Sequence, residues 1–486
     1  MRASLASSIA VTCAAVLALP VPLTAPAAAS TPSAAASALP PAPELPGSTQ
    51  SLPLQPLGAA TRSLGGGATD SGEQGLTRRD VRPFSLVGVV WDDPTAPLHG
   101  TVQVRTRATG GGTWSEWQDV ETHNEEHGAD PGSAEGRAGA LRGSTAPLWV
   151  GDSDGVEIRV RGEETLPSGL RLELVDPGEG PAGDQDQERT AEREAPAPHS
   201  RTAAMPVAPA ALSAPEAAAS AVNAQLAPYG ATWIPALSKE ETELTVRTMH
   251  LQDAGRTAPV QAAPPAAAAG QAAPAAPAAA AAKPYIGPQP KIITRKGWGA
   301  DESIREKGFV YTKTIKAAFV HHSATGNNYT CSKAPSVLRS IYRYHVLSSG
   351  WRDIGYNFAV DKCGNIYEGR AGGVAKPVLG AHTLGFNTNS MGIAVLGTFT
   401  KSNPPAAVVT AVARLTAWKL GLHGVNPKGS SYLVSGGGNL YKKGTTVRFN
   451  SIAGHRDGFA TECPGARLYG KLGTARTSSA KYQGRP

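Results

Sequence analysis

Apolar and polar side chains alternate along several short stretches in the first half of the chain. This period-two pattern is typical of strands with one buried and one solvated face. Because clusters of Gly, Pro and Asp separate the stretches, we predict a small all-β, sandwich-like accessory domain over residues 81–178. Four tryptophans either fill its core or line a carbohydrate-binding surface: Trp91, Trp114, Trp117 and Trp149. The stretches that suggest strands are residues 85–91, 101–107, 156–161 and 170–175.

The C-terminal part of the chain mixes two periodicities. Apolar runs of strand length alternate with stretches in which apolar residues recur every three or four positions, as on one face of a helix. Strands that alternate with helices indicate an α/β domain, with a mixed β-sheet and flanking helices. We place this domain at residues 289–475, followed by a tail at 476–486. The predicted strands are residues 315–321, 356–360 and 391–396, and the predicted helices are 335–349 and 405–420.

The N-terminus has the pattern of a secretory signal peptide over residues 1–29. Arg2 supplies the positive start, an apolar stretch follows, and Ala27 to Ala29 form a small-residue cleavage site. A transmembrane anchor is the alternative, but the apolar stretch is short and is interrupted by Pro20 and Pro22. We therefore expect a secreted protein.

Two further regions show neither periodicity. Residues 30–80 are rich in Ala, Pro, Ser and Gly and are predicted to be disordered, and residues 179–288 form a linker that is first acidic and then rich in Ala and Pro. The 55 Gly and 40 Pro residues in a chain of 486 fit this large share of linker. Charge is also divided unevenly. Residues 283–486 hold 28 Lys and Arg against 8 Asp and Glu, a net charge of +20, and the rest of the chain carries −13.

The cysteines and histidines suggest a metal site. Without the signal peptide three cysteines remain, and in an oxidising compartment an odd number leaves one thiol outside any disulfide. One member of the pair His321/His322, with His455 and Cys463, would supply three N/S ligands. Three protein ligands and one open position are typical of catalytic zinc.

The assignment of one cysteine to zinc decides the partner of the others. A thiolate bound to a metal is protected from disulfide exchange, so Cys331 and Cys363 then pair with each other. The alternative is that these histidines and cysteines are structural, as lone residues of both types usually are, and spacing alone does not exclude it.

Six motifs of the C-terminal domain occur in a characteristic order. They are His321–Thr325 (HHSAT), Gly350–Phe358 (GWRDIGYNF), Ile366–Arg370 (IYEGR), Gly380–Thr383 (GAHT), Asn389–Ile393 (NSMGI), and Gly454–Asp457 (GHRD) with Cys463–Gly465 (CPG). This series resembles the peptidoglycan recognition proteins and the type 2, zinc-dependent N-acetylmuramoyl-L-alanine amidases, which are related to phage lysozyme-amidases. The resemblance covers about residues 291–472.

The resemblance implies hydrolysis of the amide that joins the lactyl group of muramic acid to the stem peptide of peptidoglycan. It implies Zn²⁺ as the cofactor, with His321, His455 and Cys463 as its ligands. It also implies that Tyr356 is catalytic. Thr461 stands at a position that is lysine in the phage relatives, and we assign it to assist the tyrosine in stabilising the oxyanion.

Two more histidines match positions that line the peptide cleft in the family. His345 and His382 are therefore candidate substrate contacts, and the alternative for each is a packed, hydrogen-bonded histidine. Ala394 stands where some amidases of this fold have a glutamate base, so the sequence offers no evident carboxylate base.

The leading interpretation is a secreted, monomeric zinc amidase that acts on peptidoglycan outside the cell or at the cell wall. A non-catalytic peptidoglycan-binding recognition protein is the alternative, although a mere receptor needs no open zinc site. An unrelated zinc peptidase is disfavoured, because the His-Glu-x-x-His motif is missing from the sequence.

The charge asymmetry supports three interpretations of its own. The +20 region would be attracted to an anionic cell wall, or its charge only keeps the protein soluble. Nucleic acid is not an expected partner, because export would separate the protein from the nucleic acids of the cell and the sequence has no nucleic-acid-binding motif. Alternatively, the −13 part folds back on the basic domain and restrains it.

Overall fold

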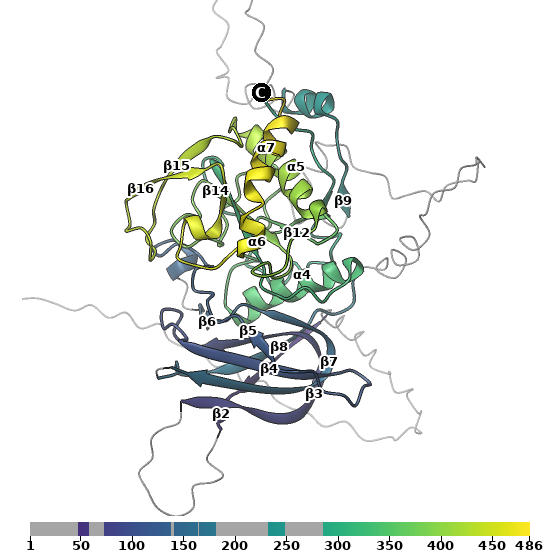
Figure 1. Cartoon of the computed structure of the whole chain (residues 1–486), viewed down its shortest axis with the longest axis vertical. Coiled ribbons are helices and arrows are strands. Elements are labelled where there is room, and N and C mark those ends of the chain that lie inside the picture. The colour runs from purple at the N-terminus through teal and green to yellow at the C-terminus, as the bar shows by residue number, and fades with distance from the viewer. Residues whose placement is uncertain (1–46, 58–71, 138–139, 164, 181–231, 248–284) are drawn as a thin grey trace, which may run out of the picture. The chain divides into compact units, whose positions relative to one another are not determined.

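The computed structural model describes residues 47–57, 72–137, 140–163, 165–180, 232–247 and 285–486 (Figure 1). The predicted signal peptide at 1–29, the acidic stretch at 184–194 and the Ala/Pro-rich stretch at 258–283 lie outside these residues. Within the described part of the chain, no helix is both long and apolar enough to cross a membrane.

In the described residues of the N-terminal domain, the paired strands run antiparallel to one another. Its strands are β1 (Ser48–Pro53), β2 (Gln55–Pro56), β3 (Glu73–Trp91), β4 (Gly100–Ala108), β5 (Gln118–Val120), β6 (Gly143–Ser144), β7 (Leu148–Gly162) and β8 (Arg171–Asp176). Their order in the sheet is β1-β8-β3-β7-β4-β5, and β2 and β6 pair with β3. Strand β3 pairs with β8 along one edge and with β7 along the other, and its register with β7 shifts between Leu76 and Leu86. The prediction of an all-β domain is confirmed.

The burial of alternate side chains explains which strands could be predicted from the sequence. In β4, Val102 and Val104 are buried and Thr101 is exposed, as the alternation requires. Strands β1 and β2 lie in the stretch predicted to be disordered. Strand β1 consists mainly of small polar residues and pairs along its whole length with β8 through the main chain. Main-chain pairing of this kind leaves no apolar periodicity in the sequence.

The C-terminal domain is built on a mixed sheet of seven strands, as predicted. Its strands are β9 (Trp233–Ile234), β10 (Ile292–Ile293), β11 (Ala317–His322), β12 (Phe358–Val360), β13 (Ile366–Glu368), β14 (Ser390–Val395) and β17 (Ile452–Gly454). They follow the order β17-β11-β14-β12-β13-β10-β9. Strand β11 is parallel to both β14 and β17, and β12 is antiparallel to β13. Strands β15 (Ser430–Val434) and β16 (Thr446–Asn450) form a separate antiparallel pair.

Helices cover both faces of this mixed sheet (Figure 1). They are α4 (Ala334–Arg343), which continues into a π-helical turn at Tyr344–Ser348, α5 (Ala406–Leu422), α6 (Ala466–Tyr469) and α7 (Leu472–Tyr482). Alternate residues of β14 point to opposite faces. Ile393 and Val395 share a core with residues of α5 and α7, whereas Ala394 shares a core with residues of α4. Both predicted helices are present, and the predicted fold class is confirmed.

The described residues of both domains belong to one compact unit, in which the N-terminal domain packs on α4 and the turn after it. Leu86 of β3 belongs to the same buried core as Ile341 of α4. The hydroxyl of Tyr344 shares its one proton between the carbonyls of Val89 and Thr145, at 3.2 and 3.1 Å. We call this contact the docking face.

A disulfide links the start of the α4 region to the turn between β12 and β13. It joins Cys331 to Cys363, whose Cα atoms are 6.2 Å apart. Cys463 is free and buried. The cysteine left outside the disulfide is therefore the one that the sequence assigned to a metal.

Candidate metal centre

Two of the expected ligands emerge side by side from the mixed sheet. Strands β11 and β17 run parallel, with Val320 paired to Gly454. The next residue of each strand is a histidine, so His321 and His455 leave the pairing at the same level, with ring centroids 4.4 Å apart. Parallel pairing thus brings together two histidines that lie far apart in the sequence.

Cys463 reaches the same place through the loop after His455. The main-chain N–H of Arg456 donates to the carbonyl of Cys463 at 3.0 Å, which turns the loop back toward the sheet. The Cys463 sulfur then lies 3.8 Å from Nδ1 of His321. The structure therefore brings all three expected ligands to one point.

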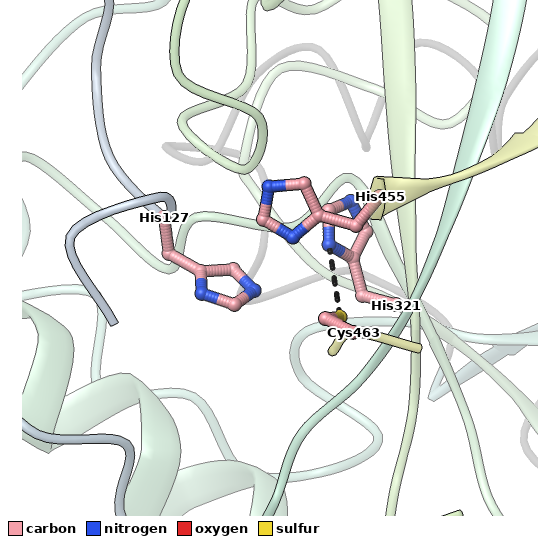
Figure 2. Close-up of side chains that lie close together, drawn as sticks. All are labelled: His127, His321, His455 and Cys463. Atoms are coloured by element: carbon pink, nitrogen blue, oxygen red, sulfur yellow. Dashed lines mark hydrogen bonds between the residues drawn. The ribbon is translucent and has the colours of Figure 1, made fainter. Parts of the chain in front are cut away.

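A fourth side chain enters this centre from the N-terminal domain. Figure 2 shows His127 facing the three others. One ligand atom from each of the four residues lies within 4.8 Å of all the rest. In tetrahedral zinc sites the Zn–N and Zn–S distances are about 2.0–2.1 and 2.3 Å, which puts the donors roughly 3.5 Å apart. A small contraction would bring all four donors to that spacing.

The electrostatics of the centre suit a cation. Burial lowers the pKa of His321 and of His455 well below the ordinary value and lowers that of His127 to about 3. The imidazoles are thus neutral, the form that binds metals. Burial also raises the pKa of the Cys463 thiol, and a bound divalent ion would reverse this by stabilising the thiolate.

The donors themselves fit zinc. Among the described residues, both ring nitrogens of His127 and of His455 are buried without a hydrogen-bond partner. Buried polar atoms are normally paired, so such orphaned nitrogens require an explanation. Three imidazoles and one thiolate are ligands that zinc prefers.

Comparisons with known proteins identify the family. Residues 32–199 match the family described as Rv3811 N-terminal galactose-binding domain-like, and residues 311–466 match N-acetylmuramoyl-L-alanine amidase. Peptidoglycan-recognition protein SC2 of Drosophila simulans is 30% identical over 185 residues, which cover 38% of this chain and 85% of that protein. The chain belongs to the peptidoglycan-recognition protein family. The resemblance seen in the motifs is confirmed.

Other members of the peptidoglycan-recognition protein family match over similar lengths. Peptidoglycan-recognition protein 1 of Holotrichia diomphalia is 27% identical over 183 residues, covering 38% of this chain and 79% of that protein. Among solved structures, wild-type Drosophila PGRP-LB has 28% sequence identity and a TM-score of 0.30, covering 38% of this chain and 92% of that chain.

The tyrosine assigned to catalysis by likeness to the family lies beside the metal centre. The Tyr356 ring centroid is 5.4 Å from that of His321 and 5.8 Å from that of His127. Burial raises the pKa of the phenol well above its ordinary value, so it stays protonated and can donate a hydrogen bond. Thr461 is also close, but its hydroxyl donates to a carboxylate oxygen of Glu126 at 2.7 Å. Its role at an oxyanion stays a prediction.

The two candidate substrate contacts are buried. His345 accepts a hydrogen bond from the Gly355 N–H through Nδ1, at 3.3 Å. His382 Nδ1 lies 3.0 Å from the hydroxyl of Thr383, which is itself 3.4 Å from Nε2 of His321. His382 therefore lies behind a metal ligand, and both histidines are less than 4% exposed. Contact with substrate stays a prediction for both.

Sequence reasoning missed His127. Its one signal is the run His123–His127 (HNEEH), in which two histidines four residues apart enclose acidic residues. Such spacing puts two side chains on one face in a helix and in a strand alike, so by itself it does not indicate a metal site. In the structure the side chain of His123 is 65% exposed, and that of His127 is 7% exposed.

Proposed function

We propose that the protein is a secreted, zinc-dependent N-acetylmuramoyl-L-alanine amidase that cleaves the lactyl-L-alanine amide of peptidoglycan. The observation that carries this proposal is the convergence of His321, His455 and Cys463 beside Tyr356. Membership of the peptidoglycan-recognition protein family and the match to the amidase family model support the substrate class.

In this proposal, the metal and the side chains around it have different roles in hydrolysis of the amide. Bound zinc would supply a Lewis acid that polarises the amide carbonyl and lowers the pKa of water from about 15.7 towards 7. Thr383 lies against Nε2 of His321, so Nδ1 is the nitrogen of His321 that would hold the metal. Tyr356 donates its phenolic proton in a hydrogen bond to the carbonyl oxygen as this gains negative charge.

The direct test is digestion of purified peptidoglycan, with the fragments identified by mass spectrometry. Free stem peptides that begin with L-alanine should appear, and a zinc chelator should suppress them. Tyr356→Phe should bind zinc normally but hydrolyse about 10²–10³ times more slowly, since one oxyanion donor is lost. Tyr441→Phe, in a separate apolar cluster, is the matched control. Binding of the muramyl peptide with no release of stem peptide would favour the non-catalytic recognition protein instead.

The proposal also covers where the enzyme works. Residues 1–29 have the pattern of a signal peptide, and the +20 charge of residues 283–486 favours an anionic wall. Electrostatic attraction between exposed charges is screened by salt. Wall binding should therefore weaken as salt rises, and binding that is insensitive to salt would argue against this part of the proposal.

A further inference from the structure

One segment of the N-terminal domain, residues 121–137, crosses to the metal centre. We call it the arm. It begins directly after β5, and His127 lies on it. It carries five acidic residues, and the domain that it contacts carries most of the positive charge. The acidic residues are Glu121, Glu125, Glu126, Asp130 and Glu135.

The strongest anchor of the arm is a buried ion pair. Glu135 accepts two hydrogen bonds from the guanidinium of Arg370, at 2.8 and 2.9 Å, and both side chains are less than 8% exposed. The N–H of Arg352 donates to the same carboxylate at 3.2 Å. Bidentate pairs of this kind fix orientation as well as position.

Two more carboxylates hold the arm on either side of His127. Asp130 Oδ1 accepts hydrogen bonds from the Gly385 N–H at 2.9 Å and from the side-chain amide of Asn387 at 2.6 Å. Glu126 accepts from the Thr461 hydroxyl. The arm is therefore fixed in one position over the centre.

In this position the arm fills the place that a catalytic zinc site keeps open. Such a site has three protein ligands, and a site with four is closed and structural. The cavity that remains beside His127, Tyr356 and Cys463 measures about 20 Å³. That is room for about one water molecule, whereas sites for small-molecule ligands measure about 300–1,000 Å³. This cavity is too small to hold a muramyl peptide.

We propose that the arm is an autoinhibitory latch. His127 closes the metal site, the acidic anchors hold the arm in place, and substrate enters only when the arm lifts. The latch rests on the proposed function and adds its regulation. The docking face lies on α4 and uses other residues, so the arm can lift while the domains stay together. If only a fraction of molecules is open, the apparent affinity for substrate equals the affinity of the open form multiplied by that fraction.

A reversible lock tests the latch. A Cβ built on Gly436 would lie 3.5 Å from the Cβ of Asp130, which matches the separation of about 3.5–4.5 Å in disulfides. The double variant D130C/G436C should therefore form a disulfide that holds the arm closed. Oxidised, it should bind a soluble muramyl peptide at least tenfold more weakly than the reduced protein in calorimetry, and it should release no stem peptide.

The single variants D130C and G436C are matched controls, because each alters the same contact without locking it. Wild-type protein treated with the same reductant controls for reduction of Cys331–Cys363. If the oxidised double variant binds the muramyl peptide as tightly as the single variants do, the latch is wrong. Binding is measured separately from hydrolysis, so a chain that cleaves nothing still tests the latch, and normal hydrolysis by the locked protein refutes the latch alone.

A second test reads the metal directly. Replacing zinc by Co²⁺ gives a visible spectrum that reports the ligands of the ion. Azide, a small anion that fills an open position, should shift this spectrum in His127→Ala at concentrations at least tenfold lower than in the wild type. His123→Ala, on the same arm but exposed, should respond like the wild type. Equal responses of the wild type and His127→Ala would show that His127 does not close the site.

Discussion

Two of the contacts between the N-terminal domain and the C-terminal domain differ in their chemistry. At the docking face, apolar side chains such as Leu86 and Ile341 share one buried core. Along the arm, the contacts are charged or polar, and the Glu135–Arg370 pair is the clearest of them. One contact joins the domains, and the other lies over the metal centre.

This difference indicates which contact is built to open. Separating the docking face would return apolar surface to water, at a cost of about 25 cal/mol for each Å². Lifting the whole arm returns both partners of the Glu135–Arg370 ion pair to water, so the regained hydration offsets much of the lost attraction. Removing one partner alone is different, because the other then stays buried without compensation. The arm should thus be easy to lift and sensitive to single substitutions.

The largest loss of stability is expected from a substitution at the docking face. Leu86→Ala should lower the free energy of unfolding by about 2–5 kcal/mol, measured by urea denaturation, because the side chain is fully buried. Leu172→Ala makes the same truncation in the separate core of the N-terminal domain. In the Co²⁺-substituted protein, neither variant should lower the azide concentration that shifts the visible spectrum. If Leu86→Ala opens it as His127→Ala does, the two contacts are not independent.

Glu135→Ala should release the arm without unfolding the protein. Arg370 keeps its hydrogen bond to the Ile354 carbonyl at 2.8 Å, so the closed form should lose about 3 kcal/mol, the lower end for a broken buried pair. Amide hydrogens of residues 121–137 should exchange up to about 100-fold faster, as measured by mass spectrometry. Glu135→Gln keeps an acceptor and should have a smaller effect. Unchanged protection of the arm in Glu135→Ala would contradict this account of the anchor.

Removal of the metal should loosen the arm and leave the docking face alone. With the ion chelated, the ring nitrogens of His127 have no hydrogen-bond partner among the described residues, and the carboxylate of Glu126 lies 3.9 Å from Nδ1. Exchange in residues 121–137 should accelerate about tenfold, which corresponds to about 1.4 kcal/mol. Exchange in α4 should not change and serves as the internal control. Equal acceleration in both regions would indicate that the ion stabilises the whole unit rather than the arm.

Much of the fold could be predicted because side-chain burial leaves a period in the sequence. The alternation in β4 and the apolar runs of β11 and β14 showed the strands directly. The set of three expected ligands could be proposed from ordered motifs, and the parallel pairing of β11 with β17 explains its geometry. Strand β1 left no such trace, since the main chain holds it.

The contribution of His127 could not be predicted, because it depends on how two folded surfaces fit together. Local sequence encodes strands and turns, but the path of the arm follows from the docking face and from the anchors on the other domain. Beside the run His123–His127, the opposite charges of the two parts, −13 and +20, were a second relevant signal. They favoured a contact between an acidic segment and the basic domain, and Glu135 with Arg370 is a contact of that kind.

The smallest loss of stability is expected at the polar edge of the docking face, where Lys333 lies 3.5 Å from Asp152. Both side chains are more than half exposed, and exposed ion pairs contribute about 0–1 kcal/mol. Lys333→Met should therefore shift the urea midpoint very little and leave exchange of the arm unchanged. A loss as large as that of Leu86→Ala would mean that charge, and not apolar burial, holds the domains together. The contrast between a persistent apolar contact and a removable charged one would then fail.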